Sequence, residues 1–386
     1  MIIGIDASNL RQGGGITHIV EILSCLRLDK HNVSRVVIWG SEQTLDQIDE
    51  RPWLIKITPK ELSRGLVYRL MWQKFKLSRS AMDHNCDLIF SPGGSVSCNF
   101  SPVVTMSRNM LPFEWNEARR YGASWITLRL ILLRWLQSKS FNSADGVIFL
   151  TNYAKKQVTK VTGDLSGLST VIPHGFNPRF CTDPKKQYDM TEYGLENPFQ
   201  ILYVSIIDQY KHQWCVVEAV ARLRKEGYPV VLNLVGPSYP PAQMRLTKAL
   251  RKFDVNDEWV KYHGEIPYLE LHNIYKHAQL GVFASSCENM PNILLETMAA
   301  GLPIACSDKG PMPDVLGHAG VYFNPETPIE IYTAIKEMID NPQLRLEKSR
   351  ASFHRAQEYS WDVCAVETFL FLEQVLANHQ KSLCAE

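Results

Sequence analysis

The sequence predicts an α/β protein with two domains, each built on a parallel β-sheet that helices cover on both faces. The chain has 386 residues, a length that suggests two or three domains. Short runs of β-branched and aromatic residues alternate with longer helical patterns, as is typical of covered parallel sheets. A polar, proline-containing stretch at residues 177–198 separates two series of such runs and marks the domain boundary.

The first domain is expected to span residues 1–180. Its strands are predicted where short apolar runs are bounded by turn residues, because strands buried on both faces read as continuous hydrophobic segments. These runs are Ile2–Asp6, Val36–Trp39, Asp87–Ser91, Val103–Met106, Gly146–Leu150 and Thr170–Pro173.

The second domain is expected to span residues 190–360 and follows the same pattern. Its predicted strands are Gln200–Ser205, Val230–Val235, Val260–His263, Leu280–Ser285, Pro303–Cys306 and Val321–Phe323. We find no short internal repeat and no low-complexity tract.

Composition excludes several classes of protein. Hydrophobic residues make up 45% and charged residues 21% of the chain, an ordinary globular balance. No uncharged apolar run reaches 18 residues, so no membrane-spanning helix is expected. Asp6 interrupts the apolar N-terminus, and no signal peptide is expected. The nine cysteines are scattered without a CxxC or zinc pattern, which favours reduced thiols and a cytoplasmic location.

Charge is distributed unequally although the net charge is only +1. Residues 1–180 carry 22 Lys and Arg against 14 Asp and Glu, and the remainder carries 19 against 26. This asymmetry favours two domains with different partners. Nucleic acid is not expected as a partner, because no recognition motif accompanies the basic residues.

A glycine-rich turn, Gly13–Gly15, follows the first predicted strand and precedes a helical pattern. Gly14 and Gly15 would allow close approach of an anion to backbone N–H groups at the start of that helix. A merely flexible turn explains the glycines equally well. The turn is not GxGxxG, which argues against an NAD-dependent dehydrogenase.

The most specific segment runs from Ser285 to Pro303. Pro291 suits the first position of a helix and Gly301 the position just after its end. The N–H groups of Asn292, Ile293 and Leu294 would then lie where a parallel strand ends, the place where open α/β sheets bind ligands such as a diphosphate. Glu288 precedes this helix and Glu296 lies within it, and carboxylates suit hydroxyl donors such as sugars.

Seven residues separate Glu288 from Glu296, and this spacing resembles the EX7E motif of retaining glycosyltransferases of the GT-B fold, most similar to glycosyltransferase family 4. Residues 299–325 also resemble that family. The resemblance implies two Rossmann-like domains facing across a cleft, the first binding the acceptor and the second the nucleotide sugar. Tyr359–Trp361 and the helical pattern of residues 361–386 are similar to the family's final helix, which crosses back to the N-terminal domain.

The resemblance also implies roles for single residues on the donor side. Glu296 would bind the ribose hydroxyls, Glu288 a hydroxyl of the donor sugar, and Lys211 the diphosphate. Ser205 and Ile206 stand where the family often has Gly-Arg, so part of its phosphate-binding charge is missing here.

Further positions follow from the same resemblance. Ile266 belongs to a loop expected beside the nucleotide base. His174 lies in a turn similar to the family's strand end at the cleft, where it would reach a phosphate or sugar or serve only in packing. Arg108 and Asn109 lie on the acceptor side, where many members carry a histidine. Arginine stays protonated, so no general base is assigned.

The implied reaction is retaining, metal-independent transfer of a sugar from a nucleotide-diphosphate sugar, GDP-mannose or a UDP-sugar, with no cofactor. The chain contains no DxD triplet. The expected acceptor is a saccharide, preferably lipid-linked, in assembly of surface polysaccharide or lipopolysaccharide O-antigen. Two alternatives stay open: a GT-B nucleotide-sugar epimerase and a non-catalytic nucleotide-sugar-binding protein.

Two segments combine basic and apolar residues. Residues 63–82 and the helical part of residues 118–144 alternate Arg and Lys with Leu, Ile, Met, Phe and Trp. Such helices can lie on an anionic membrane, which predicts peripheral attachment to the inner face of the cytoplasmic membrane. For the second segment, burial of Leu128, Ile131, Leu132 and Trp135 in a domain core explains the pattern equally well.

Overall fold

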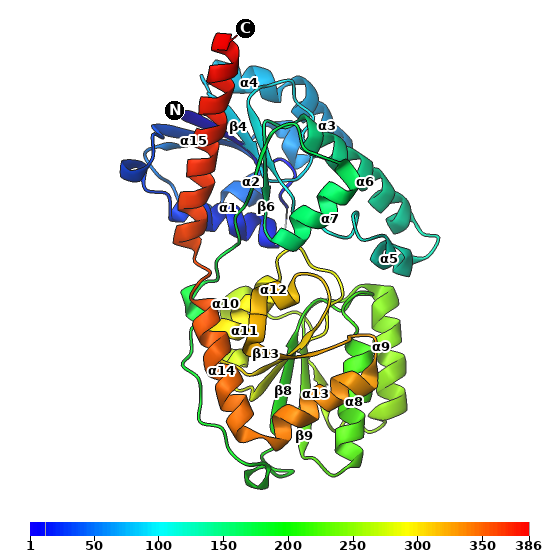
Figure 1. Cartoon of the computed structure of the whole chain (residues 1–386). Coiled ribbons are helices and arrows are strands. Elements are labelled where there is room, and N and C mark those ends of the chain that lie inside the picture. The colour runs from blue at the N-terminus through cyan, green and yellow to red at the C-terminus, as the bar shows by residue number, and fades with distance from the viewer. Residues whose placement is uncertain (12, 386) are drawn as a thin grey trace. The chain divides into compact units, whose positions relative to one another are not determined.

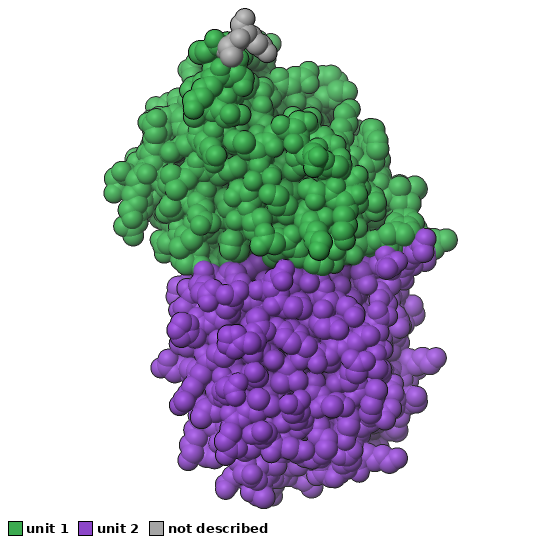
Figure 2. All heavy atoms as spheres, viewed as in Figure 1, with its two compact units in different colours: residues 1–115, 123–175, 360–386 green, residues 116–122, 176–359 purple. Residues whose placement is uncertain are grey.

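A computed structural model describes residues 1–11 and 13–385 of the chain. The chain divides into two compact units (Figure 2). Unit 1 comprises residues 1–115, 123–175 and 360–386, and unit 2 comprises residues 116–122 and 176–359. The polypeptide therefore passes between the units four times. The segment 116–122 comes from the first half of the sequence but packs in unit 2.

Unit 1 is built on a seven-stranded parallel sheet in the order β3-β2-β1-β4-β5-β6-β7. Its strands are β1 (Ile2–Asp6), β2 (Arg35–Trp39), β3 (Leu54–Ile57), β4 (Leu88–Ser91), β5 (Val103–Met106), β6 (Gly146–Phe149) and β7 (Leu168–Val171). In the register of β1, Ile3 lies beside Val36 of β2 and Leu88 of β4. All three side chains are fully buried, as expected for a sheet covered on both faces.

Helices enclose this sheet (Figure 1). They are α1 (Gly14–Ser24), α2 (Glu42–Leu45), α3 (Leu66–Phe75), α4 (Leu77–Asp83), α6 (Trp125–Ser143), α7 (Asn152–Thr162) and α15 (Trp361–Ala385). Side-chain caps explain two of the starts: Ser124 accepts from the Thr127 N–H before α6, and Thr151 accepts from the Ala154 N–H before α7. The C-terminal helix α15 belongs to unit 1 and packs against α1.

Unit 2 is built on a six-stranded parallel sheet in the order β10-β9-β8-β11-β12-β13. Its strands are β8 (Phe199–Val204), β9 (Val230–Val235), β10 (Val260–Tyr262), β11 (Leu280–Phe283), β12 (Ile304–Ser307) and β13 (Gly320–Phe323). Its helices are α8 (Gln213–Lys225), α9 (Pro240–Phe253), α10 (Tyr268–Tyr275), α11 (Asn292–Ala299), α12 (Met312–Leu316), α13 (Pro328–Asp340) and α14 (Pro342–Ala356). Proline lies in the first turn of α9, α13 and α14, where its fixed φ suits a helix start.

Both sheets reverse their strand order once, and several of the predicted site residues follow the strands at these reversals. In unit 1 the order reverses between β1 and β4, and in unit 2 between β8 and β11. At such a point the loops that leave neighbouring strands diverge and open a crevice at the carboxyl ends of the strands. The glycine turn follows β1, and Lys211 and Glu288 follow β8 and β11.

Among the described residues, no helix combines the length and the hydrophobicity that crossing a membrane requires.

Candidate functional site

Lys211 and Glu288 meet in unit 2 at the carboxyl ends of β8 and β11. The Lys211 ammonium forms a charge-assisted hydrogen bond with Glu288 Oε1. The side chains are only 8% and 15% exposed. Two loops separated by more than 70 residues thus place opposite charges at the strand-order reversal, the position where open α/β sheets bind ligands.

The surroundings of Lys211 hold it in place. Its carbonyl accepts a 2.8 Å hydrogen bond from the Tyr203 hydroxyl on β8. Its ammonium nitrogen lies 5.0 Å from the ring centre of Tyr210 and 5.5 Å from that of Phe283, within the range of cation–π attraction. A cation so fixed can bind an anion without first being ordered.

The first turn of α11 follows directly after Glu288. The N–H of Leu294 donates to the Pro291 carbonyl at 2.9 Å and that of Asn292 to the Met290 carbonyl at 3.0 Å. An anion at Asn292, Ile293 and Leu294 would therefore share two of these three donors with backbone carbonyls. The helix dipole still favours negative charge here.

Glu296 is buried on α11, with 4% of its surface exposed. Burial raises its pKa to about 8, although a hydrogen bond from Tyr268 and the charge of Arg179 oppose that shift. Its Oε2 atom is buried and has no partner within hydrogen-bond geometry among the described residues, while the nearby Tyr275 hydroxyl also favours the ionised form and so opposes the rise in pKa. A carboxylate oxygen in this state is suited to accept a hydrogen bond from a ligand hydroxyl.

Ser205 and the loop of Ile266 follow β8 and β10, the two strands that flank β9 in the sheet. A Cβ atom on residue 236 would lie 2.3 Å from the Ser205 carbonyl oxygen. The two backbone segments can therefore approach this closely only because residue 236 is glycine, whose φ is +140°. The Gly236 N–H donates to the Gly264 carbonyl at 2.7 Å, which ties the loop of Ile266 to β9. Ile206, which stands where the family that the sequence resembles often has an arginine, is 37% exposed.

In unit 1, Arg108 lies against the glycine turn. Its guanidinium donates to the Gly15 carbonyl at 3.5 Å, and a Cβ atom on Gly15 would lie 3.7 Å from it. Burial lowers the pKa of Arg108 to about 10, so it remains a cation at neutral pH. Among the described residues no carboxylate lies within ion-pair distance of it. Arg108, Gly14 and Gly15 together can therefore attract an anion.

His174 and Asn109 are placed differently. His174 is 2% exposed, and its ring stacks on His18 at 4.8 Å and packs against Trp361 at 5.1 Å. This burial favours packing over direct contact with a ligand. Asn109 Oδ1 accepts from the Leu111 N–H at 3.1 Å and so shapes its own loop.

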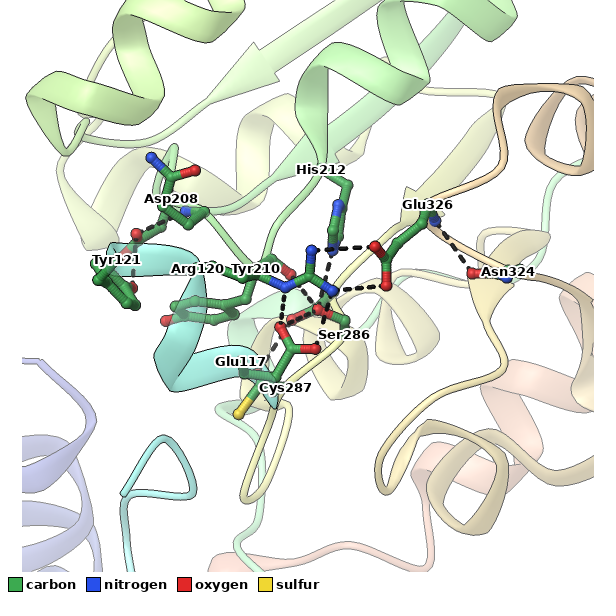
Figure 3. A network of polar contacts seen from close by, with 12 residues as sticks. Glu117, Arg120, Tyr121, Asp208, Tyr210, His212, Ser286, Cys287, Asn324 and Glu326 are labelled. Atoms are coloured by element: carbon green, nitrogen blue, oxygen red, sulfur yellow. Dashed lines mark hydrogen bonds and ion pairs between the residues drawn. The ribbon is translucent and has the colours of Figure 1, made fainter. Parts of the chain in front are cut away.

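Several residues around these groups carried no local sequence signal. Arg179, Tyr268 and Tyr275 approach Glu296 from the interdomain segment and from α10. Glu117, Arg120, His212 and Ser286 form a polar network (Figure 3). In the chain, His212 directly follows Lys211, and Ser286 lies two residues before Glu288. They come from distant segments, so only tertiary structure reveals them.

A cavity of about 530 Å³ lies elsewhere in unit 2. It is lined by the segment around Lys185–Tyr188 and by Gln279 and Leu302, which precede β11 and β12. It is therefore at the amino ends of the strands, the edge opposite to Lys211 and Glu288, and contains none of the predicted site residues.

Several proteins of assigned function are similar to this chain in amino-acid sequence. The O-antigen chain mannosyltransferase B of Escherichia coli is 25% identical over 229 residues, which are 58% of this chain and 57% of that protein. A GDP-mannose-dependent alpha-(1-6)-phosphatidylinositol monomannoside mannosyltransferase of Mycobacterium tuberculosis is 23% identical over 310 residues, 77% of this chain and 78% of that protein. The chain spans a little over half the length of the first curated relatives it matches.

Solved structures share the fold. Sucrose-phosphate synthase of Thermosynechococcus elongatus superposes with a TM-score of 0.77 at 17% identity, covering 98% of this chain and all of that one. WaaG, a glycosyltransferase involved in lipopolysaccharide biosynthesis, gives 0.67 at 14% identity, covering 96% and 99%. The prediction of two parallel, Rossmann-like α/β domains of the GT-B type is thereby confirmed. Residues 161–356, half of the chain, match the family described as glycosyl transferases group 1, and the chain belongs to this family.

Proposed function

We propose that this glycosyltransferase is a retaining enzyme of family 4 that uses a nucleotide-diphosphate sugar as donor. The observation that carries the proposal is the arrangement at the strand-order reversal of unit 2. There Lys211 and Glu288 are paired beside the first turn of α11, and Glu296 keeps an unpartnered buried carboxylate oxygen. This set offers a cation and a helix start for phosphate and two carboxylates for hydroxyl groups.

Lys211 is proposed to stabilise the charge that develops on the leaving diphosphate. When donor binds, the ammonium exchanges part of its contact with Glu288 for a phosphate oxygen, and the dipole of α11 adds to its effect. Glu288 is then available to accept a hydrogen bond from a hydroxyl of the donor sugar. Gly14 and Gly15, with the cation of Arg108, are a second proposed phosphate contact.

Glu296 is proposed to bind the ribose. Its Oε2 atom would accept a ribose hydroxyl hydrogen, which removes the cost of an unpaired buried oxygen. Tyr268 lies beside it with its ring against the Arg179 guanidinium, 5.1 Å from the ring centre. The loop of Ile266, which leads into α10, would lie along the base.

The transfer itself is proposed to need no protein base and no metal. The bond between the sugar's anomeric carbon and the phosphate oxygen breaks while the acceptor oxygen bonds to the same carbon from the same face. The acceptor proton goes to the released phosphate oxygen. Arg108 near the acceptor side remains charged and cannot take this proton, whereas it can stabilise the anion.

GDP-mannose and UDP-sugars are the proposed donors. Two relatives support GDP-mannose: the O-antigen chain mannosyltransferase B and the GDP-mannose-dependent mannosyltransferase. A structure of similar fold, Anabaena HepE in complex with UDP, supports the second, with a TM-score of 0.66 at 18% identity over 99% of each chain. A saccharide is the proposed acceptor, and the O-antigen relative and WaaG support a lipid-linked one in surface polysaccharide assembly.

We also infer peripheral attachment to an anionic membrane, with the protein on the cytoplasmic side. Leu128, Ile131, Leu132 and Trp135 of α6 are 46–61% exposed, so the core-burial explanation of their pattern is wrong for these four. On α3, Leu66, Val67, Met71 and Phe75 are similarly exposed. Arg and Lys side chains accompany both faces, which suits a surface of anionic lipids.

The test begins with thermal unfolding in the presence of GDP, UDP, dTDP, ADP, CMP or NAD at equal concentration. A ligand that binds only the folded state at a hundred times its Kd stabilises it by about 2.7 kcal/mol. One nucleoside diphosphate is expected to raise Tm clearly. NMR of the product formed from the matching sugar donor and a saccharide acceptor should then show the donor's anomeric configuration.

Two results would oppose the proposal. The absence of any shift with the diphosphates, or a shift with NAD alone, removes the donor site. A changed nucleotide sugar formed without acceptor would instead indicate an epimerase.

A further inference from the structure

Residues 116–122, here called the strap, bring three side chains to three different loops of unit 2. The strap contains the end of α5 (Trp115–Ala118) and the turn Arg119–Tyr121. Glu117 reaches the loop after β11, Arg120 the loop after β13, and Tyr121 the loop after β8 (Figure 3). All three loops leave the carboxyl ends of the sheet, where Lys211 and Glu288 lie.

Ser286 is the point at which the strap joins two of these loops. Its hydroxyl donates to Glu117 Oε2 at 2.6 Å, and its N–H donates to the Tyr210 carbonyl at 2.8 Å. Its oxygen also lies 2.9 Å from His212 Nε2. Ser286, His212 and Glu117 are all more than 90% buried, so water cannot readily replace these bonds.

The network fixes the protonation state of His212 and the ring nitrogen that carries its hydrogen. Burial lowers its pKa to about 4, so the ring is neutral at physiological pH. The single hydroxyl hydrogen of Ser286 goes to the carboxylate of Glu117, because that bond is the shorter and is charge-assisted. His212 must therefore donate from Nε2, and a chain of hydrogen bonds runs from His212 through Ser286 to Glu117.

Arg120 serves as a bridge between two carboxylates. Its Nε and Nη2 donate to Glu117 at 2.7 and 3.1 Å, and its Nη1 and Nη2 donate to Glu326 at 3.0 and 2.6 Å. These contacts hold the pKa of Glu326 below its usual range. Four of the five guanidinium hydrogens are thus in use, and two negative charges surround one positive charge. Arg120 does not replace the cation missing at Ile206; it fixes the orientation of Glu117.

Tyr121 holds the turn that leads to Lys211. Its hydroxyl donates to Asp208 Oδ1 at 2.8 Å, and the same oxygen accepts from the Gln209 N–H at 2.7 Å. The Lys211 N–H in turn donates to the Asp208 carbonyl at 3.1 Å. A change in the backbone conformation of Asp208 would therefore disturb the turn that contains Lys211.

We propose that Glu117, Arg120 and Tyr121 are positioning residues that hold Lys211 and Glu288 in the geometry for transfer. Ser286 lies two residues before Glu288, while Asp208 and His212 lie on either side of Lys211, so the strap constrains the chain next to both members of the pair. The inference rests on the proposed function of that pair. Among the described residues, Glu117, Arg120 and Tyr121 form no hydrogen bond with Lys211 or Glu288 and act through the neighbours of that pair.

The experiment compares E117A, S286A, the double variant E117A/S286A and Y121F with the parent. A matched control, R222M, removes an arginine that pairs with Glu218 on the exposed face of α8 in the same unit. Hydrogen exchange is measured over residues 205–212 and 284–291. Both segments are expected to exchange at least tenfold faster in E117A and S286A, with Y121F affecting only 205–212 and R222M neither.

Activity provides the readout that a purely structural role would not move. We expect kcat to fall at least tenfold in E117A and in S286A, while Kd for the nucleoside diphosphate changes less than threefold. The double variant should lose no more than either single variant, because Glu117 acts through Ser286. E117Q keeps the shape and a hydrogen-bond acceptor and should recover part of kcat.

The outcomes distinguish failure of the strap proposal from failure of the proposed function. If the parent transfers sugar and E117A and S286A match it in kcat and in exchange, the strap proposal is overturned. Additive losses in the double variant also overturn it. If the parent shows no transfer with any donor, the proposed function fails, whereas unchanged exchange at 205–212 and 284–291 would still reject the strap by itself.

Discussion

Lys211 and Glu288 form an ion pair that is largely removed from solvent yet lies at the carboxyl ends of β8 and β11. Such a pair costs desolvation energy, and breaking it by removal of one partner leaves an unpaired buried charge. The pair is therefore weak evidence for stability. Under the proposed function, it keeps a cation and a carboxylate preformed and close, available to a donor's phosphate and hydroxyl groups.

Replacement of Lys211 by Ala should reduce kcat/KM through loss of about 1.5–3 kcal/mol of transition-state stabilisation, which is the range of a hydrogen bond to a charged group. It should also destabilise the protein, because Glu288 stays buried without its partner. Steady-state kinetics and urea unfolding measure the two effects.

The double variant K211M/E288Q separates stability from activity. It removes both charges, so the free energy of unfolding should return toward the parent value while activity stays low. Lys336→Met is the control, because it breaks a half-exposed ion pair with Asp340 on α13. Parent-like kcat/KM in K211A would remove this pair from the active site.

Glu296 should make nucleotide binding depend on pH. Its pKa of about 8 means that only a tenth is ionised at pH 7 in the free protein. A ribose hydroxyl favours the ionised form, so affinity for the nucleoside diphosphate should rise up to about tenfold between pH 7 and 9. The free protein behaves oppositely: its folded state holds a proton that the unfolded state releases, so stability falls as pH rises from about 4.5 to 8.

Calorimetric titration of GDP and UDP into the parent and E296Q tests this dependence. E296Q should bind more weakly and with little change across the same pH range. Glu337→Gln, an exposed position on α13, should retain the parent's slope. Equal slopes for E296Q and the parent would assign the titration to another group.

Gly175 should tolerate no side chain. A Cβ atom there would lie 2.1 Å from the Trp361 backbone nitrogen, and backbone cannot move aside as a flexible side chain can. We expect G175A to lower the free energy of unfolding by at least about 2 kcal/mol, within the range for overpacking. Gly194→Ala is the control, because nothing lies within 4 Å of its Cβ position. Equal urea midpoints for the two variants would contradict the close approach.

The sequence predicted most of the architecture because strands buried on both faces are continuous apolar runs. The runs Ile2–Asp6, Val103–Met106 and Val230–Val235 coincide with β1, β5 and β9, and the other predicted strands differ by one or two residues at their ends. β3 was missed. It is an edge strand of four residues that contains Lys56 and is mostly half-buried, so it lacks the apolar signal.

The site was predictable only where its signal is local. Glu288 and Glu296 share one segment, and Lys211 follows a strand directly. The strap was not predictable, because Glu117 lies outside every motif of the sequence and is 169 residues away from Ser286. The exposure of α6 was likewise undecided, since the spacing of Leu128 and Trp135 is the same for a core face and a surface face.

The exposed apolar face of α6 should carry membrane binding. Changing Arg129, Arg134 and Lys139 to Gln removes three cations, each worth about 1 kcal/mol near an anionic surface. We expect markedly less protein to sediment with anionic vesicles, and little parent protein to sediment with zwitterionic vesicles.

The matched control changes Lys248, Arg251 and Lys252 of α9 to Gln, which alters net charge equally on the other unit. If both triple variants bind anionic vesicles to the same extent, α6 is not the attachment site.

His18 should make the fold sensitive to acid. It is fully buried on α1 between His174 and Trp361, and neither ring nitrogen has a hydrogen-bond partner among the described residues. Burial, followed by the nearby His174 and Arg108, holds its pKa well below the usual value. Below about pH 6.5 the unfolded chain therefore binds a proton that the folded protein does not, and stability falls as pH falls, by up to about 1.4 kcal/mol per pH unit.

Urea unfolding of the parent and H18F at pH 7.5, 6.5 and 5.5 tests this linkage. Phe can preserve the ring stacking without a titrating nitrogen, so H18F should lose less stability between pH 7.5 and 5.5 than the parent does. His318→Gln, at an exposed position of unit 2, should follow the parent. A parent-like pH dependence in H18F would contradict the assignment of this linkage to His18.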